Sequence, residues 1–299
     1  MMLAPRLLLK RGLKRTAGTA AVLSHSLGLR RSSPGGCVLV YHRLTAAAWH
    51  RTSLDNWNVT PERFAAQMAA IAESCECVPL LDLPRRVAAP RTSDRPLVSI
   101  TFDDGFHGVA AHALPVLERY GLPATVFLVT SCVGRTTPMP FDRWGARAAG
   151  HVAATAWRPM DWRDVDSLLA SPLITVGSHS HLHRDGSRLS QRECRAEAQQ
   201  SRDVLRRRCG DAHARAFAYP YGSARLGHVS DVYVAAVRDA GYELAASTEL
   251  GMVTPSSSRW LLPRVEASGV DTPRMIMAKA AGALLPFFVT DRLRQRSRA

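Results

Sequence analysis

Short apolar runs alternate with amphipathic helical stretches through the middle of the chain, and this alternation limits the fold more than any other feature. Each run is too short for a helix and apolar throughout, as strands buried on both faces are. Parallel strands need crossover connections, which are usually helices. We therefore expect a parallel sheet covered by helices, with strands at residues 38–42, 97–102, 125–129, 174–176, 214–218, 243–247 and 262–265.

The stretches between these runs carry helix-start signals. Thr60 is followed directly by a proline, an N-cap with proline at the first helical position. Ser190 and a glutamate three residues later form a capping box that opens a helix ending before Gly210. Asp161 and Ser230 are expected to cap two further helices. Strand and helix in strict alternation predict a (β/α) barrel or an open doubly wound sheet.

No repeat or low-complexity linker divides residues 37–284, which we take as one domain between a basic N-terminal arm (1–36) and a basic C-terminal tail (285–299). These two ends carry ten of the 14 net positive charges. The body is therefore only mildly basic, and a nucleic-acid partner is not expected. The arm lacks a clear signal-peptide cleavage site, and we expect it either to be solvated or to contact an anionic membrane surface peripherally.

The six cysteines show no CxxC spacing and are too few for a disulfide scaffold in a chain of 299 residues. We expect buried thiols, with Cys194 and Cys209, which fall on one expected helix, as the pair most open to another role.

No apolar run approaches the ~18 residues that a membrane span requires, so no spanning helix is expected.

The strand expected at 97–102 ends in two adjacent carboxylates and a glycine, Asp103-Asp104-Gly105. Two like charges at one strand end repel each other unless a cation or a proton makes their states different. The carboxyl ends of parallel strands are also where α/β folds hold their active sites. A solvated turn is the alternative interpretation of the same residues.

Three histidines follow the strand expected at 174–176, in residues 177–183 (Gly-Ser-His-Ser-His-Leu-His). His179 and His183 are four residues apart and face the same way if the loop forms one helical turn, so both can bind one divalent metal. Asp104 would complete a two-histidine, one-carboxylate set with positions left open for water, which is the arrangement of a catalytic site. Ordinary surface or core histidines are the alternative.

Two aromatic segments offer further candidate site residues. Residues 217–222 (Phe-Ala-Tyr-Pro-Tyr-Gly) end another expected strand, form a rigid rim, and offer a backbone N–H that can meet a developing oxyanion. Residues 141–144 (Phe-Asp-Arg-Trp) are expected either to line a sugar cleft, with Trp144 stacking on a sugar ring, or to bury that tryptophan.

In this order, each at a strand end, the three motifs resemble the polysaccharide deacetylases of the NodB homology family, carbohydrate esterase family 4. The resemblance spans about residues 38–284 and rests on Thr-Phe-Asp-Asp-Gly at 101–105 together with the histidine motif. Residues 38–43, 60–64 and 121–127 are similar to the branch of exopolysaccharide and poly-N-acetylglucosamine deacetylases. The fold implied is a distorted (β/α)7 barrel.

The resemblance also implies a role for each motif residue. Asp104, His179 and His183 would hold a divalent metal, with Zn²⁺ as the first choice and Co²⁺ or Ni²⁺ as alternatives. Asp103 would be the base that takes a proton from the attacking water. The backbone N–H of Tyr221 would share the oxyanion. The substrate would be an N-acetylated polysaccharide or oligosaccharide. Hydrolysis would release acetate and leave a free amine on the sugar.

Two positions depart from the family pattern. Ala218 stands where the family commonly has an arginine that orients the base. Arg264 is the candidate replacement by chain position and charge, with a surface ion pair as the alternative. No Leu-x-x-His segment, the usual source of the general acid, occurs between residues 243 and 299. His228 and His42 are the candidate proton donors, and for each a structural role is the alternative.

The function expected is therefore a metal-dependent hydrolase of carbon–nitrogen bonds that removes N-acetyl groups from N-acetylhexosamine units of a polysaccharide. An O-acetyl esterase acting on a sugar polymer is one alternative, because an alkoxide leaves more readily than an amine and needs a weaker proton donor. A non-catalytic, glycan-binding barrel is another. Since the family works in the bacterial envelope, we expect the protein in the envelope or associated with the membrane, on a side that the sequence does not assign.

Overall fold

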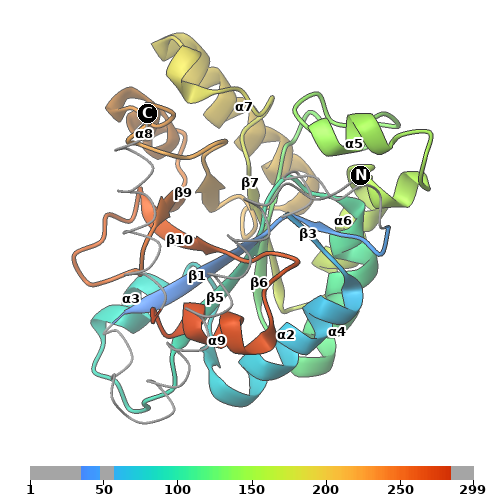
Figure 1. The fold of residues 1–299 in the computed structure, drawn as a ribbon. Helices are drawn as coiled ribbons and strands as arrows, with labels where there is room; N and C mark the ends of the chain where they lie inside the picture. The colour runs from blue at the N-terminus through green and yellow to red at the C-terminus, as the bar shows by residue number, and fades with distance from the viewer. Residues whose placement is uncertain (1–34, 48–56, 284–299) are drawn as a thin grey trace, which may run out of the picture.

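Residues 35–47 and 57–283 are described in the computed structural model of the protein, shown in Figure 1. The strands are β1 (Gly36–Tyr41), β2 (Arg43–Leu44), β3 (Asn58–Val59), β4 (Glu76–Cys77), β5 (Leu97–Phe102), β6 (Ala124–Leu128), β7 (Ile174–Ser178), β8 (Ala216–Ala218), β9 (Leu244–Leu250) and β10 (Leu262–Glu266). The α-helices are α2 (Pro61–Ser74), α3 (Leu83–Ala88), α4 (Leu114–Tyr120), α5 (Arg143–Ala148), α6 (Trp162–Leu169), α7 (Gln191–Cys209), α8 (Asp231–Asp239) and α9 (Pro273–Ala280).

The main sheet closes on itself. Its strands pair in parallel in the order β1-β10-β9-β8-β7-β6-β5, and β1 also pairs with β5. The result is a barrel of seven parallel strands, with β4 added beside the start of β5. The expected (β/α)7 barrel is confirmed. It is distorted at two places: β7 and β8 share one register pair, and a bulge interrupts the pairing of β10 with β9.

Local sequence signals account for the elements that build this barrel. Each of the seven expected strands overlaps one barrel strand. The side chains of Thr60, Asp161, Ser190 and Ser230 accept backbone hydrogen bonds as the N-caps of α2, α6, α7 and α8. The predicted capping box of α7 is present, and Gly210, with a φ of 85°, ends that helix. The capping predictions are thus confirmed.

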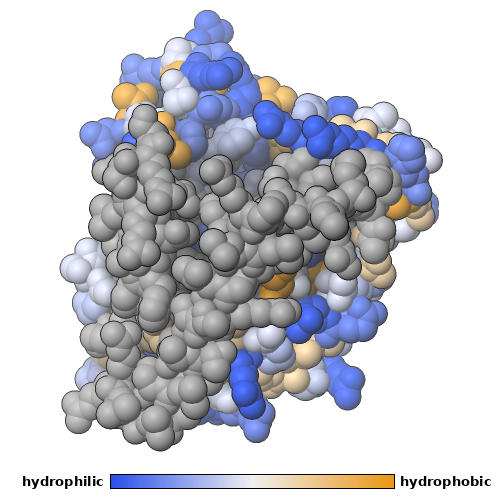
Figure 2. Space-filling view, viewed as in Figure 1, coloured by the Kyte–Doolittle hydropathy of each residue, from blue (hydrophilic) through white to orange (hydrophobic). Residues whose placement is uncertain are grey.

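The helices pack in groups around the barrel. Helix α2 contacts both α9 and α4 on one side, and α7 lies against α8 elsewhere on the wall (Figure 1). In Figure 2, the coloured residues lie mainly along the outline of the molecule, and most of them are hydrophilic. Within the described part of the chain, no helix combines the length and the apolar character needed to cross a lipid bilayer.

All six cysteines are free thiols. Cys194 lies near the start of α7 and Cys209 at its end, so a rise of about 1.5 Å per residue separates them by roughly 22 Å. A disulfide between them is therefore excluded in this fold. The predicted basic arm and tail, with the membrane contact expected of the arm, fall almost entirely outside the described residues.

Candidate active site

The three sequence motifs meet at the carboxyl ends of β5, β7 and β8. Within residues 35–47 and 57–283, four non-glycine residues have positive φ angles, and all four belong to the loops that follow these strands. Such backbone costs about 1–3 kcal/mol per residue and persists only where surrounding contacts impose it, as they often do at functional sites. The residues are Asp104 (72°), Ser180 (63°), His183 (56°) and Tyr221 (58°).

Tight packing enforces the turn after β5. Gly105 is also left-handed, with a φ of 75°, and a Cβ at this position would lie 2.7 Å from a methyl carbon of Leu128. A side chain there would have to push this methyl group aside, and glycine adopts the left-handed conformation without steric cost. The chain therefore turns immediately after β5, which leaves Asp103 and Asp104 at the strand end.

Asp104, His179 and His183 form a cluster that could hold a metal ion, as each offers a ligand atom within 4.8 Å of the others. Oδ1 of Asp104 lies 3.5 Å from Nε2 of His179 and 3.4 Å from Nε2 of His183. Two ligands placed ~2.1 Å from a tetrahedral ion are about 3.4 Å apart. The donor atoms and their spacing thus fit a divalent cation.

The ionisation states of His179 and Asp104 suit metal ligands. Nδ1 of His179 lies 2.8 Å from the carbonyl oxygen of Ala218, so it carries the proton and leaves the lone pair on Nε2. Burial lowers the pKa of His179 to about 4, which keeps the ring neutral at pH 7. Although burial opposes ionisation of Asp104, its hydrogen bond with His183 and the nearby histidines hold the pKa of this carboxyl well below its usual value.

The helical turn considered for residues 179–183 does not form. The loop bends through left-handed Ser180 and His183, with no helix between them. A carboxylate from α7 holds the bend: Oε2 of the buried Glu197 accepts the backbone N–H groups of His181 (3.0 Å) and Leu182 (2.8 Å). Glu197 lies well beyond the motif, and nothing local in the sequence marks it as part of this loop.

Asp103 is paired with a buried arginine. Arg264 is 2% exposed and donates from both terminal nitrogens to the two carboxylate oxygens of Asp103, each at 2.7 Å. Its Nε donates to the carbonyl of Ser247 at 2.8 Å. Burial alone would raise the pKa of Asp103, but Arg264, assisted by His179, lowers it below its usual value. The alternative of a surface ion pair for Arg264 is therefore wrong.

The bulge between β9 and β10 lies at this arginine. Leu262 aligns with Ala246, whereas Arg264, two residues later, aligns with Leu250, four residues further along β9. Bulges of this kind redirect side chains beside active sites. Here Arg264 enters the barrel interior with its guanidinium on Asp103.

The two candidate proton donors occupy different places. His42 stacks on Trp57, with ring centroids 5.3 Å apart, and its charge contributes to the lowered pKa of both Asp103 and Asp104. His228 lies 5.6 Å from the ring of Tyr221, which is 46% exposed at the rim. The structure thus sets His42 in the electrostatic environment of the carboxylates and His228 beside the rim aromatic.

The segment between β6 and α6 reaches the site through Phe141, the first residue of the Phe-Asp-Arg-Trp segment. The ring of Phe141 lies parallel to that of His183, with centroids 3.6 Å apart and an interplanar angle of 17°. Trp144 is only 4% exposed and packs under the Arg43 guanidinium at 4.4 Å. The prediction of a buried tryptophan is confirmed, and that of a sugar-stacking Trp144 is wrong.

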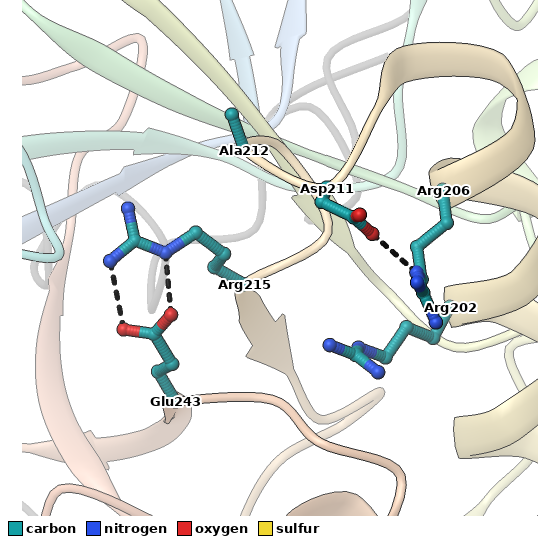
Figure 3. A pocket seen from close by; sticks show the side chains of 6 residues that line it. All are labelled: Arg202, Arg206, Asp211, Ala212, Arg215 and Glu243. Atoms are coloured by element: carbon teal, nitrogen blue, oxygen red, sulfur yellow. Dashed lines mark hydrogen bonds and ion pairs between the residues drawn. The ribbon is translucent and has the colours of Figure 1, made fainter.

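A separate cavity of about 540 Å³ lies near the amino ends of β8 and β9 (Figure 3). Its charged groups are already satisfied: Arg215 pairs with Glu243 through two hydrogen bonds, and Arg206 pairs with Asp211. Arg202 donates to main-chain carbonyls. Since the motif residues gather at the opposite ends of the strands, this cavity is not the candidate active site.

Comparisons with known proteins find polysaccharide deacetylases. Residues 91–245 match the family model described as polysaccharide deacetylase. The chain is 25% identical over 224 residues to the poly-beta-1,6-N-acetyl-D-glucosamine N-deacetylase of Staphylococcus epidermidis, an alignment covering 72% of this chain and 70% of that protein.

Two solved structures share the fold. The Streptococcus pyogenes deacetylase PplD in complex with acetate has a TM-score of 0.66 and 18% identity, covering 82% of this chain and 98% of that one. IcaB from Ammonifex degensii has a TM-score of 0.64 and 24% identity, covering 83% and 97%.

A closed barrel of seven parallel strands, with carboxylates and histidines gathered at one end, places the chain among the (β/α)-barrel enzymes. The family model matches more than half of its residues, and the chain belongs to the polysaccharide deacetylase family. Its enzyme class is accordingly that of hydrolases acting on carbon–nitrogen bonds other than peptide bonds.

Proposed function

We propose that the chain is a divalent-metal-dependent hydrolase that removes N-acetyl groups from N-acetylhexosamine units of a polysaccharide. The observation that carries the proposal is the cluster of Asp104, His179 and His183 beside an aspartate that a buried arginine holds by both oxygens. The name of the staphylococcal relative, a poly-beta-1,6-N-acetyl-D-glucosamine N-deacetylase, supports this substrate class.

Asp104, His179 and His183 would hold the metal, with Zn²⁺ the first choice for two imidazoles and one carboxylate, and Co²⁺ or Ni²⁺ as alternatives. When bound, the cation would supply Lewis-acid polarisation of the scissile carbonyl. The lone pair on Nε2 of His179, fixed by the Ala218 carbonyl, supports this assignment.

The remaining residues would handle protons and charge. Asp103, ionised because of Arg264, would take the proton of the attacking water at a carboxylate oxygen. Arg264 would keep that carboxylate in one orientation. The N–H of Tyr221, on a strained rim residue, would donate to the oxyanion, and His228 or His42 would supply the proton of the departing amine.

The test is acetate release from β-1,6-linked N-acetylglucosamine oligomers by chelator-treated protein before and after Zn²⁺ is restored. We expect release only with metal, none from His179→Ala, and a loss of about 10²–10⁴-fold in Asp103→Asn with metal binding retained. Release that survives both chelation and His179→Ala would refute the metal site. An Asp103→Asn protein that deacetylates normally would refute the assigned base.

The absence of a Leu-x-x-His segment between residues 243 and 299 favours one alternative, an O-acetyl esterase. An alkoxide leaves with less help from a proton donor than an amine does. N-acetyl and O-acetyl versions of one oligosaccharide, assayed side by side, separate the two activities. Activity confined to the ester would replace the N-deacetylase proposal.

We also propose that the protein works in the bacterial envelope, which its membership in a family of polysaccharide deacetylases supports. Separation of periplasmic, membrane and cytosolic fractions, followed by detection of the full-length protein, tests this location. Recovery in the cytosolic fraction alone would refute it.

A further inference from the structure

The two histidines of the proposed metal site are held in different ways. Nδ1 of His179 hydrogen-bonds to the carbonyl of Ala218. Nδ1 of His183 is buried and meets no hydrogen-bond acceptor among the described residues. A histidine that binds metal through one nitrogen usually has its ring oriented by a hydrogen bond from the other. The ring of His183 must therefore be oriented by other contacts.

Aromatic packing supplies those contacts. The ring of Phe141 lies flat against His183, with centroids 3.6 Å apart and 17° between the planes. Tyr221 and His179 meet the same ring at steep angles, with centroids at 5.1 and 4.9 Å. Rotation of the His183 ring about its Cβ–Cγ bond would drive it into Phe141, because a parallel stack at this distance leaves no free space.

The backbone gives little help in placing this side chain. His183 has a φ of 56°, in the left-handed region that non-glycine residues rarely occupy. Its N–H donates to Oγ of Ser180, which is itself left-handed. A ring carried by a strained residue keeps one orientation only if neighbouring side chains enforce it.

A buried ion pair holds the backbone directly next to Phe141. The next residue, Asp142, accepts a hydrogen bond from Arg43 in β2 and caps α5 through the backbone N–H of Gly145 at 2.9 Å. Both members of the pair are nearly inaccessible, with side chains 4% and 6% exposed. The Arg43 guanidinium also packs on the ring of Phe106 at 4.0 Å, in the cluster against which Phe141 packs.

We propose that Phe141 is a positioning residue for the metal site, and that the Arg43–Asp142 ion pair holds Phe141 against His183. In this arrangement the segment between β6 and α6 sets metal affinity through a ring stack in place of the hydrogen bond that orients His179. The inference rests on the proposed function, because it assigns His183 as a ligand.

The test measures metal binding directly rather than activity. Zn²⁺ affinity is determined by competition with a chromophoric chelator, and the visible spectrum of the Co²⁺-loaded protein reports ligand geometry. Phe141→Leu, which removes the ring, is expected to weaken Zn²⁺ binding about 10-fold or more, the scale of other losses of ligand-orienting contacts, and to alter the Co²⁺ spectrum. Phe141→Tyr, which keeps the ring, is expected to stay within about twofold of wild type.

Phe64→Leu is the matched control. It removes a ring of the same size from the main core, where Phe64 packs on Tyr41 and Phe102 rather than on His183. Equal Zn²⁺ affinity in Phe64→Leu and wild type would show that loss of packing alone does not weaken the site. Should Phe141→Leu fail to fold, Phe141→Met takes its place, because methionine fills the space without presenting a flat face.

Asp142→Asn tests the ion pair separately. Asparagine can still cap α5 but lacks the charge that pairs with Arg43, so we expect a smaller loss of Zn²⁺ affinity in the same direction. Unchanged affinity would refute the part assigned to Arg43 and Asp142.

The outcomes for the main proposal are distinct. Wild-type protein that binds Zn²⁺ through His179 while Phe141→Leu matches it in affinity and Co²⁺ spectrum would overturn the role of Phe141 alone. Wild-type protein that binds no metal would overturn the proposed site, and this inference with it.

Discussion

Replacing Arg264 with methionine tests whether the Asp103 carboxylate depends on this one buried partner. Methionine keeps an unbranched apolar side chain but removes both hydrogen bonds to Asp103 and the bond to the Ser247 carbonyl. Asp103 is 2% exposed, so water cannot readily replace the lost guanidinium. Breaking a buried ion pair from one side costs about 3–5 kcal/mol, because the remaining charge is left uncompensated.

A loss of that size is easily measured. For a domain of this length, each kcal/mol corresponds to roughly 2–4 °C in Tm, so Arg264→Met should melt about 6–20 °C below wild type. The assay is urea unfolding of chelator-treated protein followed by far-ultraviolet circular dichroism, which separates the ion pair from any effect of bound metal. Arg184→Met is the control, since Arg184 forms an ion pair of similar length, 2.6 Å, on the surface. It should cost no more than about 1 kcal/mol.

The double variant Arg264→Met/Asp103→Asn supplies the decisive comparison. Asparagine removes the uncompensated charge. The double variant should therefore lose less stability than the two single variants lose together, by up to about 3 kcal/mol. Additive losses, or a cost of less than about 1 kcal/mol for Arg264→Met, would refute the coupling inferred from the geometry.

Three further predictions concern the Glu197 contact, the cysteine thiols and the two candidate proton donors. Glu197→Ala leaves the two loop N–H groups without an acceptor and should lower the free energy of unfolding by about 1–3 kcal/mol. Glu197→Gln keeps an acceptor oxygen and should recover most of this loss. Equal urea midpoints for the two variants would contradict the prediction. Burial raises the pKa of Cys75 and Cys77 to about 12 and that of Cys209 to about 11. Thiol reagents at pH 8 should therefore modify the folded protein slowly, while all six cysteines react in guanidinium without reductant; a missing pair would reveal a disulfide. His42→Asn should lower turnover of an N-acetyl substrate about 100-fold and His228→Asn less, because His42 shares the electrostatic environment of the carboxylates; the reverse order would assign the proton donor to His228.

The elements of the fold could be predicted because their signals are local. A buried strand is a short apolar run, and a helix start is a capping residue with a partner three positions away, so each is written within a few residues. The motifs could be found for the same reason, since Asp103 and Asp104 directly follow β5 and the histidines directly follow β7. The family resemblance added the order in which these motifs occur.

Contacts between distant residues could not be predicted in this way. Spacing alone suggested a helical turn for residues 179–183, but Glu197, sixteen residues beyond His181, gathers the loop amides and sets a different bend. Chain position and charge made Arg264 a candidate partner of Asp103, with a surface ion pair as the alternative. The contact itself spans 161 residues and depends on the bulge between β9 and β10 and on barrel closure. The stack of Phe141 on His183 depends on an ion pair with Arg43, 99 residues from Asp142. Such contacts are fixed by tertiary packing, for which no local pattern exists.

The position of Arg264 shows why a missing motif residue need not leave a site incomplete. In a closed barrel, inward-facing side chains from different strands converge near the axis, so a charge required at one point can come from several strands. Ala218 of β8 leaves that position uncharged, while its backbone carbonyl accepts the hydrogen bond of His179. Arg264 of β10 reaches Asp103 from the other side, since β1 alone separates β10 from β5. What the carboxylate requires is a guanidinium within hydrogen-bonding distance, and barrel closure allows β10 to provide it.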